Sequence, residues 1–73
     1  MGSVYKSIKI IGSSPLSFED AAQNAIAKAA RVLTNLRVAE VSEMDAQLKN
    51  GNVVLYRVKV GLSFKVEVEP ETI

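Results

Sequence analysis

The last third of the chain alternates apolar and polar residues without a break. Every second residue within 53–70 is apolar, in the row Val54, Tyr56, Val58, Val60, Leu62, Phe64, Val66 and Val68. The positions between them are mostly polar or charged, among them Arg57, Lys59, Ser63, Lys65 and Glu67. Strict alternation of this kind predicts a strand with one buried face and one solvated face. At about 3.3 Å per residue, such a strand would span roughly 50 Å.

A shorter strand is predicted near the start of the chain. Residues 4–12 are rich in β-branched side chains, and their imperfect alternation places Ile8 and Ile10 on the buried face. Residues 12–17 combine Gly, Ser and Pro, which is the composition of a turn. Ser17 at the end of this turn is a good helix cap.

The pattern of residues 18–33 predicts a helix. Glu19 and Asp20 fall in its first turn, where the helix dipole favours negative charge. Most apolar positions are Ala, so the helix can lie close to a sheet, although a thin layer of Ala buries little area. Thr34 and Asn35 end the helix. Its predicted apolar face consists of Phe18, Ala22, Ala25, Ile26, Ala29, Val32 and Leu33.

Residues 36–49 alternate again and predict a second strand. Strict alternation places Ala39 and Val41 on one face, and Val38, Glu40, Ser42 and Met44 on the other. Asn50-Gly51 then predicts a hairpin, because both residues tolerate positive φ. The order is β-α-β-β, so we expect a single α+β domain over residues 1–73 with one helix against a three-stranded antiparallel sheet.

The long final strand does not fit the size expected for the chain. A compact domain of this length has a radius of gyration of about 11 Å and a diameter of around 30 Å. A helix of about eighteen residues, roughly 27 Å long, cannot cover the whole apolar row. We therefore expect the strand to bend, with Gly61 as the candidate position, or to pack on other copies of the chain. A frayed end after Phe64 is the alternative.

Composition removes several classes of function. The chain has no Cys, His or Trp, so disulfides, thiolate metal sites and His-dependent catalysis are excluded. A formal charge of +1 gives no strong field for nucleic acid or a membrane surface. No apolar run approaches the roughly 18–20 residues of a membrane span. We expect a cytoplasmic protein that binds neither nucleic acid nor membrane.

Acidic residues of the second predicted strand are the first candidates for chemistry. Glu40, Glu43 and Asp45 supply the oxygen ligands that Ca²⁺ and Mg²⁺ prefer, and we take Glu43 and Asp45 as the candidate metal ligands. The ordinary structural interpretation is that these carboxylates form ion pairs across the sheet. In that interpretation Glu40 pairs with Lys59 or Arg57.

Basic residues of the final strand form a second candidate site. Arg57, Lys59 and Lys65 could bind RNA or the phosphates of a nucleotide. The aromatic residues Tyr56 and Phe64 belong to the opposite, apolar row. The stacking platform expected of a single-strand binder is therefore missing.

Taken together, these segments resemble the dodecin family. "VYKSIKIIGSSPLSFEDAAQNAIAKAARVLTNLRVAEV" is similar to its first strand, Gly-Ser/Thr-Ser turn, Ala-rich helix and second strand, and "YRVKVGLSFKVE" to its final strand. The resemblance implies a β-α-β-β protomer whose sheet wraps around its helix, assembled as a hollow dodecamer of cubic symmetry. It also implies a small-ligand store or trap for flavins such as FMN or riboflavin, and not an enzyme.

The resemblance also suggests which residues would bind the ligand. Val38 stands where dodecins carry the Trp that stacks on the flavin, and Arg57 stands where they carry a Gln that hydrogen-bonds the ring. Lys65 matches a basic residue that some members use for phosphate. We expect Arg57 to face Val38 in an altered site that binds a flavin weakly or takes another phosphate-bearing ligand. The alternatives are a flavin-free shell that binds Ca²⁺ through Glu43 and Asp45, and a purely structural cage.

Overall fold

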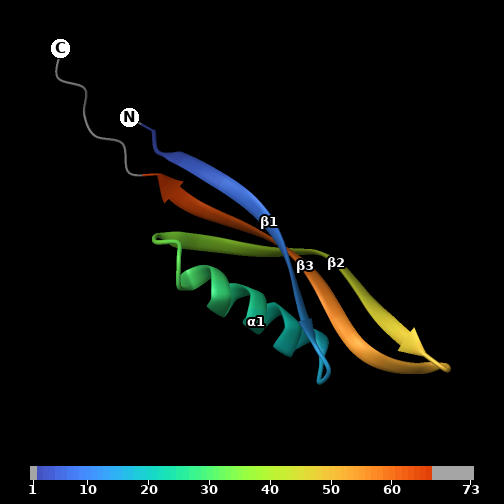
Figure 1. The fold of residues 1–73 in the computed structure, drawn as a ribbon. Coiled ribbons are helices and arrows are strands. Elements are labelled where there is room, and N and C mark those ends of the chain that lie inside the picture. The colour runs from blue at the N-terminus through green and yellow to red at the C-terminus, as the bar shows by residue number, and fades with distance from the viewer. Residues whose placement is uncertain (1, 67–73) are drawn as a thin grey trace, which may run out of the picture.

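The computed structural model describes residues 2–66, which form one helix and three strands in the order β-α-β-β (Figure 1). The elements are β1 (Val4–Ser14), α1 (Phe18–Ala30), β2 (Leu36–Lys49) and β3 (Asn52–Val66). β3 lies between β1 and β2 and is antiparallel to both. The predicted fold class is confirmed, although β1 runs two residues beyond its predicted end at Gly12.

Side chains fix the turn between β1 and α1. The Ser17 hydroxyl accepts a hydrogen bond from the backbone N–H of Asp20 at 3.0 Å, which confirms Ser17 as the helix cap. The buried Ser14 hydroxyl donates to the carboxylate of Asp20 at 2.6 Å and accepts from the N–H of Leu16 at 2.9 Å. The start of the helix is therefore tied to the end of β1.

α1 lies very close to the sheet. Its buried residues are Ala21, Ala25 and Ala29, one on each successive turn. A Cβ atom built on Gly12 of β1 would lie 2.1 Å from the backbone oxygen of Ala21 and 2.8 Å from Cβ of Ala25. Only a residue without a side chain fits there, so Gly12 and the alanine stripe together set the distance between helix and sheet.

The predicted apolar face of the helix is only partly correct. Ala25 and Ala29 are buried as expected, but Ala21, which was left off that face, is buried too. The prediction that Val32 lies on the apolar face is wrong, because the helix ends at Ala30 and Val32 is 80% exposed. The remaining predicted residues are partly buried against the core, namely Phe18, Ala22, Ile26 and Leu33.

The middle of β3 supplies the sheet's share of the core. Val58, Val60 and Leu62 are fully buried under α1, as the alternating row predicts. Ile8 and Ile10 of β1 pack beside them but are only partly buried. The core is therefore a thin layer between one strand's apolar row and one stripe of alanines.

The other end of β3 forms a hairpin with β2. Asn50 and Gly51 both have positive φ, at 52° and 78°, which confirms the predicted turn. Residues 41–56 are here called the hairpin arm; it begins beside α1, where Tyr56 packs on Phe18, and its turn extends beyond the helix (Figure 1). The arm leaves large apolar side chains between 42% and 61% exposed: Val41, Met44, Leu48, Val53 and Val54.

The molecule is elongated and does not have the compact dimensions that the long final strand failed to fit. Its radius of gyration is 16.0 Å, and its extents are 64 × 20 × 14 Å. The thirteen residues of α1 make a helix roughly 20 Å long, which cannot cover the arm. The strand keeps its length and leaves apolar surface for a partner, as the argument for self-association requires. Val68 and the acidic end of the predicted strand lie outside the described residues.

We predict that Gly12→Ala destabilises the protein by about 1–3 kcal/mol, the usual cost of overpacking a core. The added methyl meets the backbone oxygen of Ala21 at 2.1 Å, so the helix must shift. Urea unfolding followed by circular dichroism measures the loss. Gly61→Ala is the matched control, because the nearest atom to its added Cβ is 3.9 Å away. Equal effects of the two substitutions would contradict the close contact.

Candidate functional site

The face of the sheet opposite α1, here called the outer face, carries the charged residues. Because directly paired residues of antiparallel strands point to the same side, the register defines it. On β3 it comprises the residues that alternate with the buried row: Arg57, Lys59, Gly61, Ser63 and Lys65. Their partners are Tyr5, Ser7, Lys9, Ile11 and Ser13 on β1, and Val38, Glu40, Glu43 and Asp45 on β2.

A bulge at Ser42 decides which residues of β2 reach the outer face. Val41 pairs with Val60 and Glu43 with Lys59, so Ser42 is an extra residue without a counterpart on β3. Its hydroxyl donates to the backbone oxygen of Lys59 at 3.4 Å. The bulge places Glu43 on the outer face, where strict alternation would have turned it toward the helix.

Because of this bulge, the predicted faces of β2 are wrong for the residues that follow Ser42. Met44 pairs with the buried Val58, so it lies on the helix side and not beside Val38 and Glu40 as predicted. Asp45 joins Glu43 on the outer face. The two candidate metal ligands therefore point to the same side of the sheet.

Two ion pairs cross from β3 to β2 in neighbouring rows. Nε and Nη2 of Arg57 donate to Oδ1 and Oδ2 of Asp45 at 2.7 and 3.0 Å, and Nζ of Lys59 lies 3.0 Å from Oε1 of Glu43. The four side chains are 39–61% exposed. The predicted pairing of Glu40 is wrong, because Glu40 lies opposite Gly61, which offers no charge.

The arginine fork changes the titration of its partner. The hydrogen bonds from Arg57 are the main reason that the pKa of Asp45 lies below its ordinary value of 3.8, and the attraction of Arg57 and Lys59 adds to the effect. The pKa of Arg57 is raised, chiefly by the hydrogen bond to Asp45. Both shifts stabilise the paired, fully charged state.

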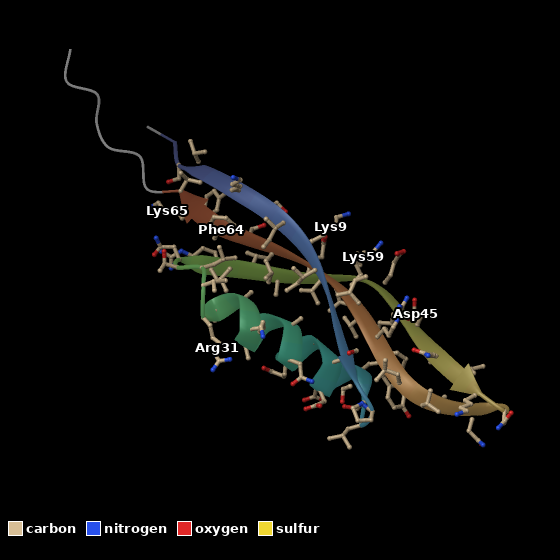
Figure 2. The ribbon with its side chains drawn as sticks, viewed as in Figure 1. Lys9, Arg31, Asp45, Lys59, Phe64 and Lys65 are labelled. Atoms are coloured by element: carbon tan, nitrogen blue, oxygen red, sulfur yellow. The ribbon has the colours of Figure 1, made fainter. Side chains whose placement is uncertain are left out.

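The ion pairs border a small cleft of about 190 Å³ on the outer face. Val58 contributes to its wall, and Ile11 of β1 closes the side opposite β2. In Figure 2, Lys9, Lys59 and Asp45 all lie on the side of the sheet away from α1. The cleft thus joins apolar surface to two anions and two cations in one exposed place.

The structure separates the residues expected to hold a flavin. Val38 is 58% exposed and lies opposite Ser63, whereas Arg57 is six residues away along β3, or roughly 20 Å. The expectation that Arg57 faces Val38 is therefore wrong within one protomer. Lys65 is two residues from Ser63, and its N–H donates to the backbone oxygen of Asn35 at 3.1 Å.

Sequence reasoning missed the contribution of β1 to this face. Ile11 pairs directly with Lys59, Lys9 lies in the next row opposite Gly61, and the exposed Tyr5 pairs with Lys65. The signal was present, since these residues alternate with Ile8 and Ile10. This alternation assigns Lys9 and Ile11 to the outer face beside Lys59 only when it is known that β1 pairs with β3.

Within residues 2–66, one protomer does not build a complete metal site from acidic side chains. The described residues contain no group of three or more His, Cys, Asp or Glu side chains that could hold a metal ion. Ca²⁺ takes six to eight oxygen ligands, and Glu43 with Asp45 offers four carboxylate oxygens at most. A Ca²⁺ ion bound there would need further oxygens, from backbone carbonyls, water or another copy. Among the described residues there is also no helix long and apolar enough to cross a membrane.

Known proteins match the chain over nearly its whole length. A family model described as dodecin matches residues 4–67. The calcium dodecin of Mycobacterium tuberculosis is 44% identical over 64 residues, which cover 88% of this chain and 90% of that protein. Its crystal structure, described as having a novel calcium-binding site, gives a TM-score of 0.79 at 40% identity and covers 96% of this chain and 100% of that one. A Thermus thermophilus dodecin mutant gives a TM-score of 0.88 at 32% identity, covering 93% and 100%.

We predict that the Asp45–Arg57 pair stabilises the fold at neutral pH and stops doing so in acid. The pKa of Asp45 is lower in the folded state than its ordinary 3.8. Its contribution is therefore present above that value and is lost as the pH falls through the lowered folded pKa. The difference in free energy of unfolding between the protein and Asp45→Asn should shrink below about pH 4.

Chemical denaturation at pH 7, 5 and 3 measures this difference. Added salt at pH 7 should reduce it as well, because both side chains are exposed and salt screens exposed charges. A difference that is the same at pH 3 and pH 7 would contradict the assignment.

Proposed function

The chain belongs to the dodecin family, and on this premise we propose that it is a non-enzymatic protein that assembles into a hollow shell of twelve copies and stores a small ligand there. The elongated shape supports the assembly. The hairpin arm extends past α1 with Val41, Met44 and Leu48 exposed, so a second copy is needed to cover it. A cytoplasmic location is part of the same proposal.

We assign no catalytic step to this protein. It has neither His nor Cys, so a nucleophilic Ser would depend on a Lys or a carboxylate as its base. Ser14 does hydrogen-bond to Asp20, but its hydroxyl is buried and also accepts from the N–H of Leu16. That arrangement caps a turn and leaves the hydroxyl no open side for a substrate.

We propose calcium as the first candidate ligand, bound by Glu43 and Asp45 together with water or oxygens of a neighbouring copy. The observation that carries this is the bulge at Ser42, which turns both carboxylates to the exposed outer face, where they lie in adjacent rows. The 44% identity to a protein named calcium dodecin supports the same ligand. Lys59 and Arg57 hold these carboxylates in the absence of metal, so calcium must displace them.

A flavin such as FMN is the second candidate, and one observation favours it. Val38, Ser63 and Ser7 form a row of small, directly paired side chains across all three strands. This row leaves flat, open surface for a planar ring. Tyr5 and Lys65 occupy the next row, where they could contact a ring edge or a phosphate. Because Arg57 lies roughly 20 Å from Val38 along the sheet, only the Arg57 of another copy could take part.

We predict that Glu43→Gln and Asp45→Asn each weaken calcium binding on the order of tenfold, because each removes a charged oxygen ligand. Lys59→Met should instead strengthen it severalfold, since Glu43 no longer has a competing partner at 3.0 Å. Isothermal titration with Ca²⁺ measures both effects. Glu19→Gln removes one negative charge far from the site and should change nothing. Equal affinities in all four variants would rule out this site.

We predict that Val38→Trp strengthens FMN binding by tenfold to a hundredfold, because one stacked aromatic ring is worth roughly 1–3 kcal/mol. Quenching of FMN fluorescence measures the affinity, and sedimentation checks that each variant keeps its assembly. Val41→Trp on the helix side of the same strand is the matched control. An unchanged affinity in Val38→Trp would mean that this row does not bind flavin.

A further inference from the structure

The basic side chains of the outer face lie close enough together to share one anion. Arg57 and Lys59 are two residues apart on the same face of β3, or roughly 7 Å. Lys9 of β1 lies diagonally across from Lys59, about 7–8 Å away, and has no ion-pair partner within residues 2–66. Gly61, directly opposite Lys9, adds no side chain to fill the space between them.

Glu43 and Asp45 prevent these cations from acting together. Each carboxylate neutralises one cation at 2.7–3.0 Å, so the four paired side chains have no net charge. All four are at least 39% exposed, and exposed ion pairs exchange partners at little cost. A ligand that occupies the carboxylates would leave Lys59 and Arg57 unpaired beside Lys9.

We propose that Lys9, Lys59 and Arg57 bind a tetrahedral oxyanion, phosphate or sulfate, when a divalent cation occupies Glu43 and Asp45. The inference rests on the proposed calcium site and adds a second ligand of opposite charge to it. Arg57 presents a planar pair of N–H donors to two oxygens, and the two lysines supply mobile ammonium groups. The cleft of about 190 Å³ that Lys59 and Arg57 line is large enough for such an ion, and Lys9 lies one row further along the sheet.

The two ligands assist each other through the ion pairs that both must break. The cation releases the basic side chains, and the oxyanion in turn releases the carboxylates. Linkage then requires that calcium raises the affinity for the oxyanion by the same factor by which the oxyanion raises the affinity for calcium. Releasing two exposed ion pairs corresponds to a factor of about 2 to 30.

Equilibrium dialysis of the assembled protein with labelled sulfate, without calcium and with saturating calcium, tests the proposal. Free Ca²⁺ is read with an ion-selective electrode, so that the reciprocal factor is measured in the same cells. Calcium should raise sulfate affinity by about 2- to 30-fold at low ionic strength. Calcium binding with unchanged sulfate affinity would overturn the inference while leaving the proposed function intact.

Variants test the oxyanion site without calcium. Glu43→Gln frees Lys59 permanently, so it should bind sulfate more tightly than the wild-type protein in calcium-free buffer. Glu19→Gln makes the same change in net charge at a distance and should not. A sulfate affinity in Glu43→Gln no higher than in Glu19→Gln overturns the inference.

Two further results complete the test. Replacing Lys59 and Arg57 together by Met should abolish sulfate binding with and without calcium, and retained binding would contradict the site. A protein that takes up no calcium, but whose Glu43→Gln variant binds sulfate more tightly, would refute the calcium function and support the oxyanion site.

Discussion

The contact between the alanine stripe of α1 and the sheet is the constraint on which the rest of this small protein depends. Gly12 allows the helix to approach until a single methyl group would no longer fit. The approach buries Val58 and Val60 but produces only a thin core, because alanines contribute little area. The helix covers part of β1 and the middle of β3, and it leaves the end of the hairpin arm uncovered. The exposed hairpin arm follows from this short and close contact, and it is the surface that the proposed assembly would cover.

Local patterns in the sequence were enough to predict most of this fold. Alternation, the Ala-rich period and Asn50-Gly51 each act over a few residues, and the order of elements and the hairpin follow from them. The bulge at Ser42 could not be predicted in this way. One extra residue leaves no mark in composition, yet it reverses the faces of Met44 and Asp45. The predicted partner of Glu40 failed for a different reason: counted from the pairing of Lys49 with Asn52 at the turn, Glu40 falls opposite Gly61 and not opposite a basic residue.

The candidate site shows the same division between local and distant information. The types of residue were available from the sequence, and Glu43, Asp45 and Arg57 do lie together on the outer face. Their distances were not available, because position along a strand becomes a distance only when the register is known. The separation of Val38 from Arg57 depends on the register, and the position of Lys9 beside Lys59 depends on the pairing of β1 with β3.

The balance of charge on the outer face constrains what it can recognise. A face with paired opposite charges has little net field, so it does not attract either a cation or an anion from a distance. An ion can then be selected only when it touches this face, where it must replace one member of an ion pair that is already held at 2.7–3.0 Å. A monovalent ion gains little from such an exchange, because it offers each carboxylate no more charge than the lysine or arginine it displaces. In the proposed calcium site a divalent cation would bridge Glu43 and Asp45 at once, and this difference in valence would make the four paired side chains selective for it.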